Sequence, residues 1–433
     1  MKVQPPRGFR DFTPEVMLLR KKVLSRIEKV FQRYGFDPID TPAIEYWEVL
    51  AGKYGSEAES KLIWRFIDPW SKREYALRYD LTVPLARYYA THRNTSLPFK
   101  RYHIGLVWRH EEPQRGRYRE FYQCDADIVG SPYPEADAEI LNVIIDVFNE
   151  LGFKDYIIRL NDRRLLSGIF EESLGITEVL PVYRTIDKLD KIGVEGVKKE
   201  LILKGLSSDI VDKIINLISI KGSPDEILSS IESQFERNRN VQIAISSLYR
   251  ILELVKDQNR IVLDLSLVRG LDYYTGPIHE VVLTNIRFGS LAGGGRYDNL
   301  IGMFIGIDIP ATGVSIGIER VIDAGIELGI FSFKPKTVTQ IYVVYMDEKF
   351  FNYAWNVANR LRDLGFNVRI DVMRRPEDKQ RRDARRLDVP IIAFIGEKEY
   401  QNNSITFYVR DKGERFNVKI EEAGKLLSRV LKM

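Results

Sequence analysis

The chain has 433 residues, of which 44% are hydrophobic and 29% charged, enough for two or three domains with apolar cores. Its net charge of +4 is small for this length, so composition neither requires nor excludes a nucleic-acid partner. The single cysteine, Cys124, excludes an intramolecular disulfide and a cysteine-rich zinc site, and the four histidines lack metal-ligand spacing. The polar N-terminus and the lack of any run of about eighteen apolar residues indicate a soluble, cytoplasmic protein without a membrane span.

The first predicted element is a helix that begins at Pro14, with Thr13 as its cap, and is closed by Gly35. A short extended piece leads to Asp40-Thr41-Pro42. In the segment LRYDLTVPLARY that follows, Asp80 and Thr82 lie on one side if the chain is extended. The simpler interpretation is a helix start capped by Thr82.

Two predicted strands flank the charged segment Arg109–Arg119. On the second strand, alternation places one set of side chains on one face: Arg119, Phe121, Gln123, Asp125 and Asp127. An exposed hairpin explains such a stripe as well as a ligand cavity does. Arg109 at the end of an apolar strand favours the cavity, because a guanidinium can bind phosphate with two hydrogen bonds and the nearby Glu111 can hold a second group.

Residues 137–151 are predicted to form an amphipathic helix, and a strand follows it. From residue 163 to 259, helical periodicity dominates and aromatic residues are few, which indicates a helical insertion. Strand patterns return near residue 261 and continue to Ile316. The insertion therefore separates two parts of one domain, residues 1–162 and residues 260–333.

The segment Val268–Leu300 carries the most unusual mixture of residues in the chain. It contains Arg269, the pair Tyr273-Tyr274 and three consecutive glycines before Arg296. Arginines and acids offer charged groups, and glycines allow a ligand or another backbone to approach closely. We expect this segment, including Arg296 and Asp298, to hold a polar and partly anionic small molecule.

The last part of the sequence contains two further candidate sites. In ATGVSIGIERV, Arg320 near a helix start can stack on a flat ring or reach phosphate, although a surface ion pair is the ordinary interpretation. Residues 337–433 alternate strands and helices, as in a small α/β domain, and carry 19 basic against 14 acidic residues. A helix there, including Arg374, Arg381 and Arg385, is as compatible with a solvated face as with RNA contact.

Taken together, these segments resemble the histidyl-tRNA synthetases, a family of class II aminoacyl-tRNA synthetases. RGLDYYTG and AGGGRYDNL resemble the family's histidine-specific segments, RHEEPQRGRYREF its second class-defining motif and GVSIGIER its third. Pro42 resembles the dimer-interface proline of the first motif. LRYDLTVPLAR and FYQCDADIVG are more similar to the archaeal and eukaryotic branch than to the bacterial one.

The resemblance implies an α+β fold: an antiparallel sheet flanked by helices, a helical insertion over residues 163–259, and an α/β anticodon-binding domain over residues 337–433. It implies a homodimer that ligates L-histidine to histidine tRNA. In the first step the histidine carboxylate attacks the α-phosphate of ATP, and in the second the terminal adenosine of the tRNA takes the histidyl group. Mg²⁺ accompanies ATP, and no protein metal site and no zinc are implied.

The resemblance also assigns roles to residues of this chain. Arg109 and Arg269 bind the α-phosphate and the carboxylate. Histidine is bound by Asp80, Leu81, Thr82, Gln123, Asp127, Tyr273 and Tyr274. ATP is bound by Arg109, Glu111, Arg117, Arg269 and Arg320. Contacts with the tRNA are assigned to Gln114, Arg115, Arg381 and Arg385.

Three positions depart from the bacterial pattern. Glu112 stands where bacterial relatives carry arginine, and Asp80 and Asp127 stand where they carry glutamate. Two other functions are compatible with parts of this pattern: a non-catalytic regulatory relative and an RNA-binding scaffold. The presence of Arg109, Arg269 and Arg320 and of a C-terminal segment favours the enzyme.

Overall fold

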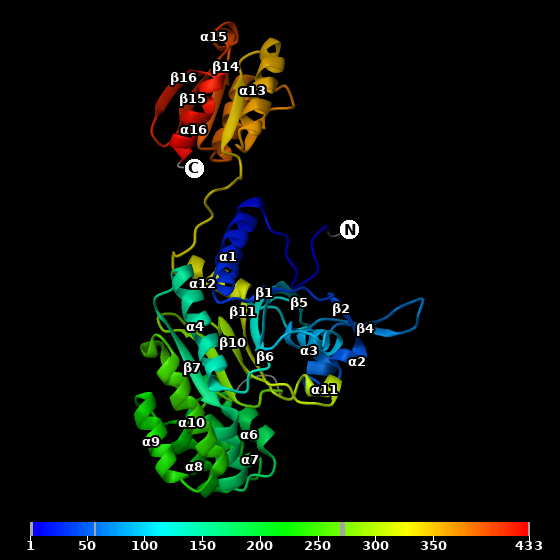
Figure 1. Ribbon diagram of the computed structural model, residues 1–433, viewed down its shortest axis with the longest axis vertical. Helices are drawn as coiled ribbons and strands as arrows, with labels where there is room; N and C mark the ends of the chain where they lie inside the picture. Colours follow the sequence, from blue (N-terminus) through cyan, green and yellow to red (C-terminus); the bar gives the residue numbers. More distant parts are fainter. Residues whose placement is uncertain (1–2, 56–57, 269–272, 432–433) are drawn as a thin grey trace. The chain divides into compact units, whose positions relative to one another are not determined.

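The computed structural model describes residues 3–55, 58–268 and 273–431 (Figure 1). The chain forms two compact units, one of residues 1–11 and 22–331 and one of residues 12–21 and 332–433. Helix α1 (Pro14–Arg33) starts and ends where its sequence predicts, and Gly35 follows it in the left-handed conformation with φ of 72°. No helix within the described ranges is long and apolar enough to cross a membrane.

The larger unit is built on an eight-stranded sheet that is antiparallel except at its two edges, where β1 pairs with β5 and β7 with β8 in parallel. In spatial order the strands are β1 (Asp37–Pro38), β5 (Phe99–Trp108), β6 (Glu120–Val129), β11 (Ala311–Gly317), β10 (Ala292–Arg296), β9 (Pro277–Leu283), β7 (Tyr156–Asp162) and β8 (Ile261–Leu263). The predicted mostly antiparallel sheet is therefore confirmed.

Alternation of side chains along the strands gives this sheet an apolar face and a polar face. On β6 the apolar residues Cys124, Ala126 and Ile128 alternate with polar ones, and all are buried. Helices α4 (Pro134–Leu151) and α12 (Ile318–Glu327) pack against β6 and β11. The predicted polar stripe begins later than expected, because β6 starts at Glu120. Arg119 lies before the strand and donates from Nε to the Glu111 carbonyl at 3.0 Å.

The larger unit also contains a three-stranded antiparallel sheet, in the order β2 (Ile44–Tyr46), β4 (Glu74–Leu77) and β3 (Arg65–Ile67). Its helices are α2 (Trp47–Leu50), a π-helical turn (Ala58–Leu62), α3 (Thr82–Thr91) and α11 (Gly302–Ile305). The buried cluster that joins them includes Leu50, Tyr79, Leu85, Tyr273 and Tyr297. The start of α3 and the Tyr273 region are thereby held in one core.

The residues between β7 and β8 are helical. The elements are α5 (Arg163–Ser167), a π-helical turn (Gly168–Ser173), α6 (Val179–Ile186), α7 (Leu189–Leu203), α8 (Ser208–Ile218), α9 (Pro224–Gln234), α10 (Arg239–Leu254) and a 3₁₀ turn (Gln258–Arg260). Helix α9 shows how local sequence sets these boundaries, since Ser223 and Glu226 form a capping box around Pro224. Figure 1 shows α6 to α10 gathered in one group (green), and α10 packs on α4.

The smaller unit has a five-stranded sheet in the order β13 (Val368–Ile370), β12 (Ile341–Tyr345), β14 (Ile391–Ile395), β15 (Ser404–Val409) and β16 (Glu414–Lys419). The first three strands are parallel and the last two antiparallel. Its helices are α13 (Phe351–Asp363), α14 (Glu377–Arg386), α15 (Glu397–Gln401) and α16 (Ala423–Leu431), with 3₁₀ turns at Glu348–Phe350 and Ile420–Glu422. The predicted α/β domain is confirmed, but its arginine-rich helix starts at Glu377, so Arg374 lies outside it.

Candidate active site

A cavity of about 770 Å³ opens on the polar face of the large sheet. Strands β6, β9, β10 and β11, the loop between β5 and β6, and the starts of α3 and α12 contribute to its walls. Most of the predicted site residues line it: Asp80, Thr82, Arg109, Glu111, Gln114, Arg115, Arg117, Gln123, Asp127, Tyr273, Tyr274 and Arg320. Residues that are as far apart in sequence as Asp80 and Arg320 thus meet in one site.

Four of the residues to which the resemblance assigns a role are not in this lining. Arg269 lies outside the described residues. Leu81 is fully buried, and its carbonyl accepts a hydrogen bond from Arg101 at 3.1 Å. Arg381 and Arg385 belong to α14 of the smaller unit, where Arg381 forms an ion pair with Glu377 at 3.0 Å and Arg385 is exposed.

Asp80 is fixed at the inner end of the cavity by three donors. Its Oδ1 accepts from the Val83 amide at 3.1 Å and from the Tyr54 hydroxyl at 2.8 Å, and its Oδ2 accepts from the Tyr273 hydroxyl at 3.3 Å. Asp80 thus accepts from an amide in the first turn of α3, whereas Thr82 is the first residue of that helix and not its cap. Burial raises the pKa of Asp80, and the three hydrogen bonds oppose that shift.

Gln123 lines the same cavity with a side-chain oxygen that has no hydrogen-bond donor among the described residues. Its side-chain amide donates to the Ser315 hydroxyl across the β6–β11 pairing. Its Oε1 is buried and accepts no hydrogen bond from the described residues. A buried amide oxygen without a donor costs free energy unless a ligand supplies one.

Asp127 is held between a cation and a hydroxyl. Its Oδ2 lies 2.8 Å from Arg101 Nη2, and its Oδ1 accepts a hydrogen bond from the Tyr297 hydroxyl. Tyr297 also lines the cavity, although no pattern in the sequence predicts a role for it. Burial raises the pKa of Asp127, while the Arg101 guanidinium and the Tyr297 hydroxyl act in the opposite direction.

The Arg101 guanidinium interacts with two buried carboxyl groups, those of Asp125 and Asp127. Asp125 is also buried, two residues before Asp127 on the same face of β6. Burial raises the pKa of Asp125 to about 8, Arg101 opposes the shift and Asp127 adds to it. Because Arg101 can neutralise only one of the two acids, burial of the pair favours the protonated form of Asp125.

An aromatic wall faces these acids. The Tyr273 ring lies 5.0 Å from that of Tyr274 and 5.8 Å from that of Tyr297, each in an edge-on arrangement. All three line the cavity, as does the backbone of Gly294. The inner end thus combines flat faces, hydroxyl groups and acceptors, which suits a small ligand with an ammonium and a ring.

Two arginines in the middle of the cavity are held by backbone carbonyls. Arg109 donates from Nε to the Tyr79 carbonyl at 3.1 Å, and its guanidinium lies 4.4 Å from the Tyr79 ring. Arg320 donates to the carbonyls of Gly116 and Ser290 at 3.1 and 2.8 Å. Neither forms an ion pair with any acid in the described ranges. Fixed guanidinium groups without acidic partners suit an anionic ligand.

The prediction that Arg296 and Asp298 contact a ligand is wrong. Arg296 donates to Asp137 of α4 at 2.7 Å, to Asp298 at 3.2 Å and to two backbone carbonyls, and it does not line the cavity. Its role is to join β10 to α4. Asp298 is held by the same arginine and accepts from the Ala311 amide at 3.2 Å.

The glycine triplet is explained by close backbone approach. A Cβ on Gly294 would lie 2.0 Å from the Gly313 carbonyl oxygen, whereas one on Gly293 would meet only the His279 carbonyl at 3.5 Å. On the neighbouring strand, a Cβ on Gly313 would lie 2.0 Å from Asp127 Oδ1. A side chain at Gly294 would push against the backbone of β11, and one at Gly313 would displace the Asp127 carboxylate.

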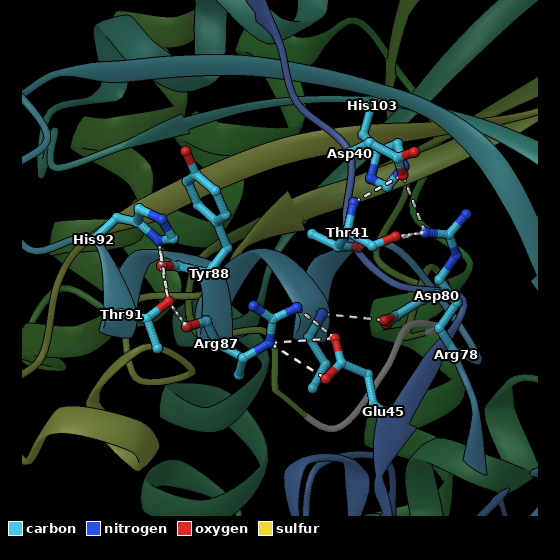
Figure 2. Close-up of polar contacts among 11 residues, drawn as sticks. Asp40, Thr41, Glu45, Arg78, Asp80, Arg87, Tyr88, Thr91, His92 and His103 are labelled. Atoms are coloured by element: carbon cyan, nitrogen blue, oxygen red, sulfur yellow. Dashed lines mark hydrogen bonds and ion pairs between the residues drawn. The ribbon is translucent and has the colours of Figure 1, made fainter. Parts of the chain in front are cut away.

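Arg78 joins β5 to the segment that precedes β2. Its Nε donates to the Leu106 carbonyl at 2.7 Å, and its Nη1 donates to the Thr41 carbonyl and lies 3.4 Å from Asp40. Figure 2 shows this guanidinium turned toward Thr41 and Asp40, with Asp80 pointing away toward α3. His103 lies 2.9 Å from Asp40, but burial lowers its pKa to about 3, so the ring is neutral.

The outer end of the cavity is more exposed and more charged. Arg117 lies 3.6 Å from Glu111, and Arg115 lies 2.6 Å from Glu327. Glu112 pairs with Arg7 and does not line the cavity. Over the described part of the chain, no three His, Cys, Asp or Glu side chains are grouped so that they could hold a metal ion.

Comparisons with known proteins identify this arrangement. The family model described as histidyl-tRNA synthetase matches residues 8–321, and the one described as anticodon binding domain matches residues 340–429. The chain is 60% identical over 428 residues to the histidine–tRNA ligase of Aeropyrum pernix, covering 99% of this chain and 98% of that protein. It is 55% identical to that of Korarchaeum cryptofilum, covering 97% of each.

A solved structure agrees with these relatives. The histidyl-tRNA synthetase of Nostoc superposes with a TM-score of 0.86 at 32% identity, covering 99% of both chains. Fold and cavity define a class II aminoacyl-tRNA synthetase, and the chain belongs to the histidyl-tRNA synthetase family. It is a histidine–tRNA ligase that uses histidine, ATP and histidine tRNA. The predicted activity and the similarity to the archaeal branch are confirmed, and the regulatory and scaffold alternatives are not supported.

Proposed function

We propose that histidine occupies the inner end of the cavity and ATP its middle. The Asp80 carboxylate, the Gln123 amide oxygen and the Thr82 hydroxyl accept the substrate ammonium, which has three N–H donors. Asp127 and the wall of Tyr273 and Tyr274 bind the imidazole. The observation that carries this proposal is the division of one cavity into an acceptor-rich end and a region with two acid-free arginines.

In the first step, the ionised histidine carboxylate attacks the α-phosphorus of ATP. A new oxygen–phosphorus bond forms and the bond to the bridging oxygen breaks, so pyrophosphate leaves and histidyl-adenylate remains. Arg109, together with Arg269, neutralises the charge that accumulates on the α-phosphate oxygens. Arg320, Arg117 and Glu111 position the rest of the nucleotide. No general base is needed, because the carboxylate is already ionised at neutral pH.

Mg²⁺ accompanies ATP in this proposal. Glu111 and Glu319 line the cavity and offer hard carboxylate oxygens, the ligand type that Mg²⁺ prefers alongside phosphate oxygens and water. The ion would neutralise phosphate charge. Removal of Mg²⁺ with EDTA should abolish pyrophosphate exchange, and addition of excess Mg²⁺ should restore it.

Histidine-dependent ATP–pyrophosphate exchange tests the assignment of residues. We expect Asp127→Asn to raise the KM for histidine with little change in the KM for ATP, and Arg269→Ala to abolish exchange while the protein remains folded. A folded Arg269→Ala protein with near-normal exchange would refute that role. An equal increase of both KM values in Asp127→Asn would refute the division of the cavity.

The domains have separate tasks in this proposal. Residues 1–162 and 260–333 form the catalytic domain, residues 163–259 an insertion, and residues 337–433 the domain that binds the anticodon arm. Gln114 and Arg115 contact the acceptor end of the tRNA, and Arg381 and Arg385 contact its anticodon arm. Arg385→Glu should weaken tRNA binding in a filter assay while leaving pyrophosphate exchange unchanged.

We also propose that the protein is a cytoplasmic homodimer. Tyr46, Tyr75 and Phe66 are register partners across β2, β4 and β3, with ring separations of 5.1 and 6.0 Å. Tyr46 and Phe66 are exposed, and Pro42 immediately precedes this small sheet. An apolar face of this kind supports a subunit contact. Phe66→Glu should then shift the mass measured by sedimentation toward the monomer, whereas Ile202→Glu on α7 should not.

A further inference from the structure

Two cations at the outer end of the cavity have no part in the roles assigned above. Lys191 comes from α7 of the helical insertion, and Arg287 comes from the loop between β9 and β10. Both are exposed and both line the cavity. Within the described residues, neither side chain forms an ion pair or a hydrogen bond.

Among the described residues, four acids of the cavity wall have arginine partners, and one of these arginines, Arg159, is shared by Glu280 with Asp190 and Asp264. The pairs are Glu111–Arg117 at 3.6 Å, Glu327–Arg115 at 2.6 Å, Glu280–Arg159 at 3.3 Å and Glu319–Arg10 at 3.8 Å. Lys191 and Arg287 therefore bring to the outer end of the cavity two cations that no acid of the described residues holds in an ion pair.

The position of Lys191 is set by contacts with the catalytic sheet. The preceding residue, Asp190, lies 3.7 Å from Arg159 on β7, and Arg159 is itself held by Asp264 at 2.7 Å. Leu189 and Asp190 line a small hollow together with Ser266 and Leu267. These contacts fix the first turn of α7 against the catalytic sheet, and Lys191 in that turn reaches the rim of the cavity.

A flat aromatic surface lies at the same end. Phe288, next to Arg287, is half-buried in the cavity wall, and the Arg115 guanidinium lies 5.9 Å from its ring. An aromatic face beside cations is the combination that binds single-stranded nucleic acid, because bases stack on the ring and phosphates pair with the charges. The histidine–tRNA ligase reaction requires the terminal ribose of tRNA to enter this cavity.

We propose that Lys191 and Arg287 bind phosphodiesters of the unpaired 3′ nucleotides of tRNA, and that Phe288 offers a stacking face to one of their bases. The triphosphate of ATP has its own cations deeper in the cavity, in Arg109 and Arg320. Lys191 and Arg287 therefore act when the tRNA terminus binds and the histidyl group is transferred, and not when histidyl-adenylate forms.

The test compares Lys191→Ala, Arg287→Ala and the double variant with Lys199→Ala, which removes an exposed lysine of α7 outside the cavity lining. Pyrophosphate exchange should be unchanged in all four variants. In the double variant, the KM for histidine tRNA in aminoacylation should rise about tenfold, and the slope of log Kd against log salt should fall by about one for each cation removed. Lys199→Ala should match the unaltered protein.

A tRNA transcript that lacks its unpaired 3′ nucleotides locates the contact. The double variant and the unaltered protein should bind this transcript equally. A rise in the KM for ATP with unchanged tRNA binding would show that the two cations serve the triphosphate, and would overturn the proposal. It would also be overturned if the truncated transcript were bound more weakly by the variant to the same extent as the complete one, or if no variant changed the KM for tRNA.

Discussion

Arg101 and Asp127 are direct cross-strand partners in the β5–β6 pairing, and their side chains form an ion pair at 2.8 Å with both groups buried. The same guanidinium donates to the Leu81 carbonyl at the start of α3. One arginine therefore connects the proposed imidazole-binding acid to the segment that carries Asp80.

Removal of the Arg101 guanidinium should lower the stability of the folded protein. Arg101→Met leaves Asp125 and Asp127 buried without a positive partner, and removal of one member of a buried ion pair typically costs about 3–5 kcal/mol. We expect the free energy of unfolding to fall by roughly 3 kcal/mol at pH 7, because protonation of a second acid recovers part of the loss. Urea denaturation followed by circular dichroism measures it.

The double variant Arg101→Met/Asp127→Asn is the matched control. Since it removes both charges, its loss of stability should be smaller than the sum of the two single losses. Additive losses, or a loss below about 1 kcal/mol for Arg101→Met, would show that the pair does not organise this wall.

Asp125 should make stability depend on pH. Its pKa is about 8 in the folded protein against about 3.9 in an unfolded chain, so between these values the folded state holds a proton that the unfolded state has lost. Its contribution to stability is therefore complete below about pH 4 and is lost as pH rises toward 8. Asp125→Asn, which resembles the protonated acid, should remove this dependence.

The measurement is the difference in unfolding free energy between Asp125→Asn and the unaltered protein from pH 5 to pH 9. As the pH rises toward 8, the unaltered protein should lose stability relative to the variant by up to about 1.4 kcal/mol per pH unit. Above pH 8 the difference should stay constant. A difference that is constant over this range would mean that Asp125 is ionised throughout.

Substitution of Tyr297 should change the KM for histidine and leave the KM for ATP unchanged. Tyr297→Phe removes the hydroxyl that donates to Asp127 and leaves the ring in the wall. A hydrogen bond to a charged group contributes about 1.5–3 kcal/mol, so the KM for histidine in pyrophosphate exchange should rise about tenfold or more. Tyr118→Phe is the control, because the Tyr118 hydroxyl lies 3.3 Å from Asp323 at the outer end. Equal effects of the two variants on the KM for histidine would contradict the role of Tyr297.

Much of the site could be predicted from the sequence because its signals are local. Alternation along β6 correctly places Gln123 and Asp127 on one face, and the hairpin between Trp108 and Glu120 is evident from its charges. The assignment of those residues to histidine came from the resemblance, since no local pattern distinguishes an imidazole from another ring.

The remaining features depend on pairings that no local pattern reveals. Arg296 looks like a ligand-binding residue until its partner Asp137, 159 residues earlier in the chain, is known. Arg101 appears as an ordinary strand residue until the β5–β6 register places it opposite Asp127. Tyr297 becomes part of the cavity only because β10 lies beside β11. Similarly, residue type favours Thr82 as the simpler choice for the cap of α3, whereas the Val83 amide of the first turn donates to Asp80.

The glycine triplet should tolerate substitution unequally. In Gly294→Ala the new Cβ would lie 2.0 Å from the Gly313 carbonyl oxygen and 2.8 Å from His279 Nε2, and a carbonyl in a paired strand cannot move away without loss of the β10–β11 pairing. In Gly293→Ala the nearest atom would be 3.5 Å away, an ordinary contact. We expect Gly294→Ala to lower the thermal midpoint by several degrees, and Gly293→Ala to leave it nearly unchanged, because overpacking costs about 1–3 kcal/mol. Differential scanning fluorimetry of the two purified variants measures this, and an equal shift in both would contradict close backbone approach as the reason for the triplet.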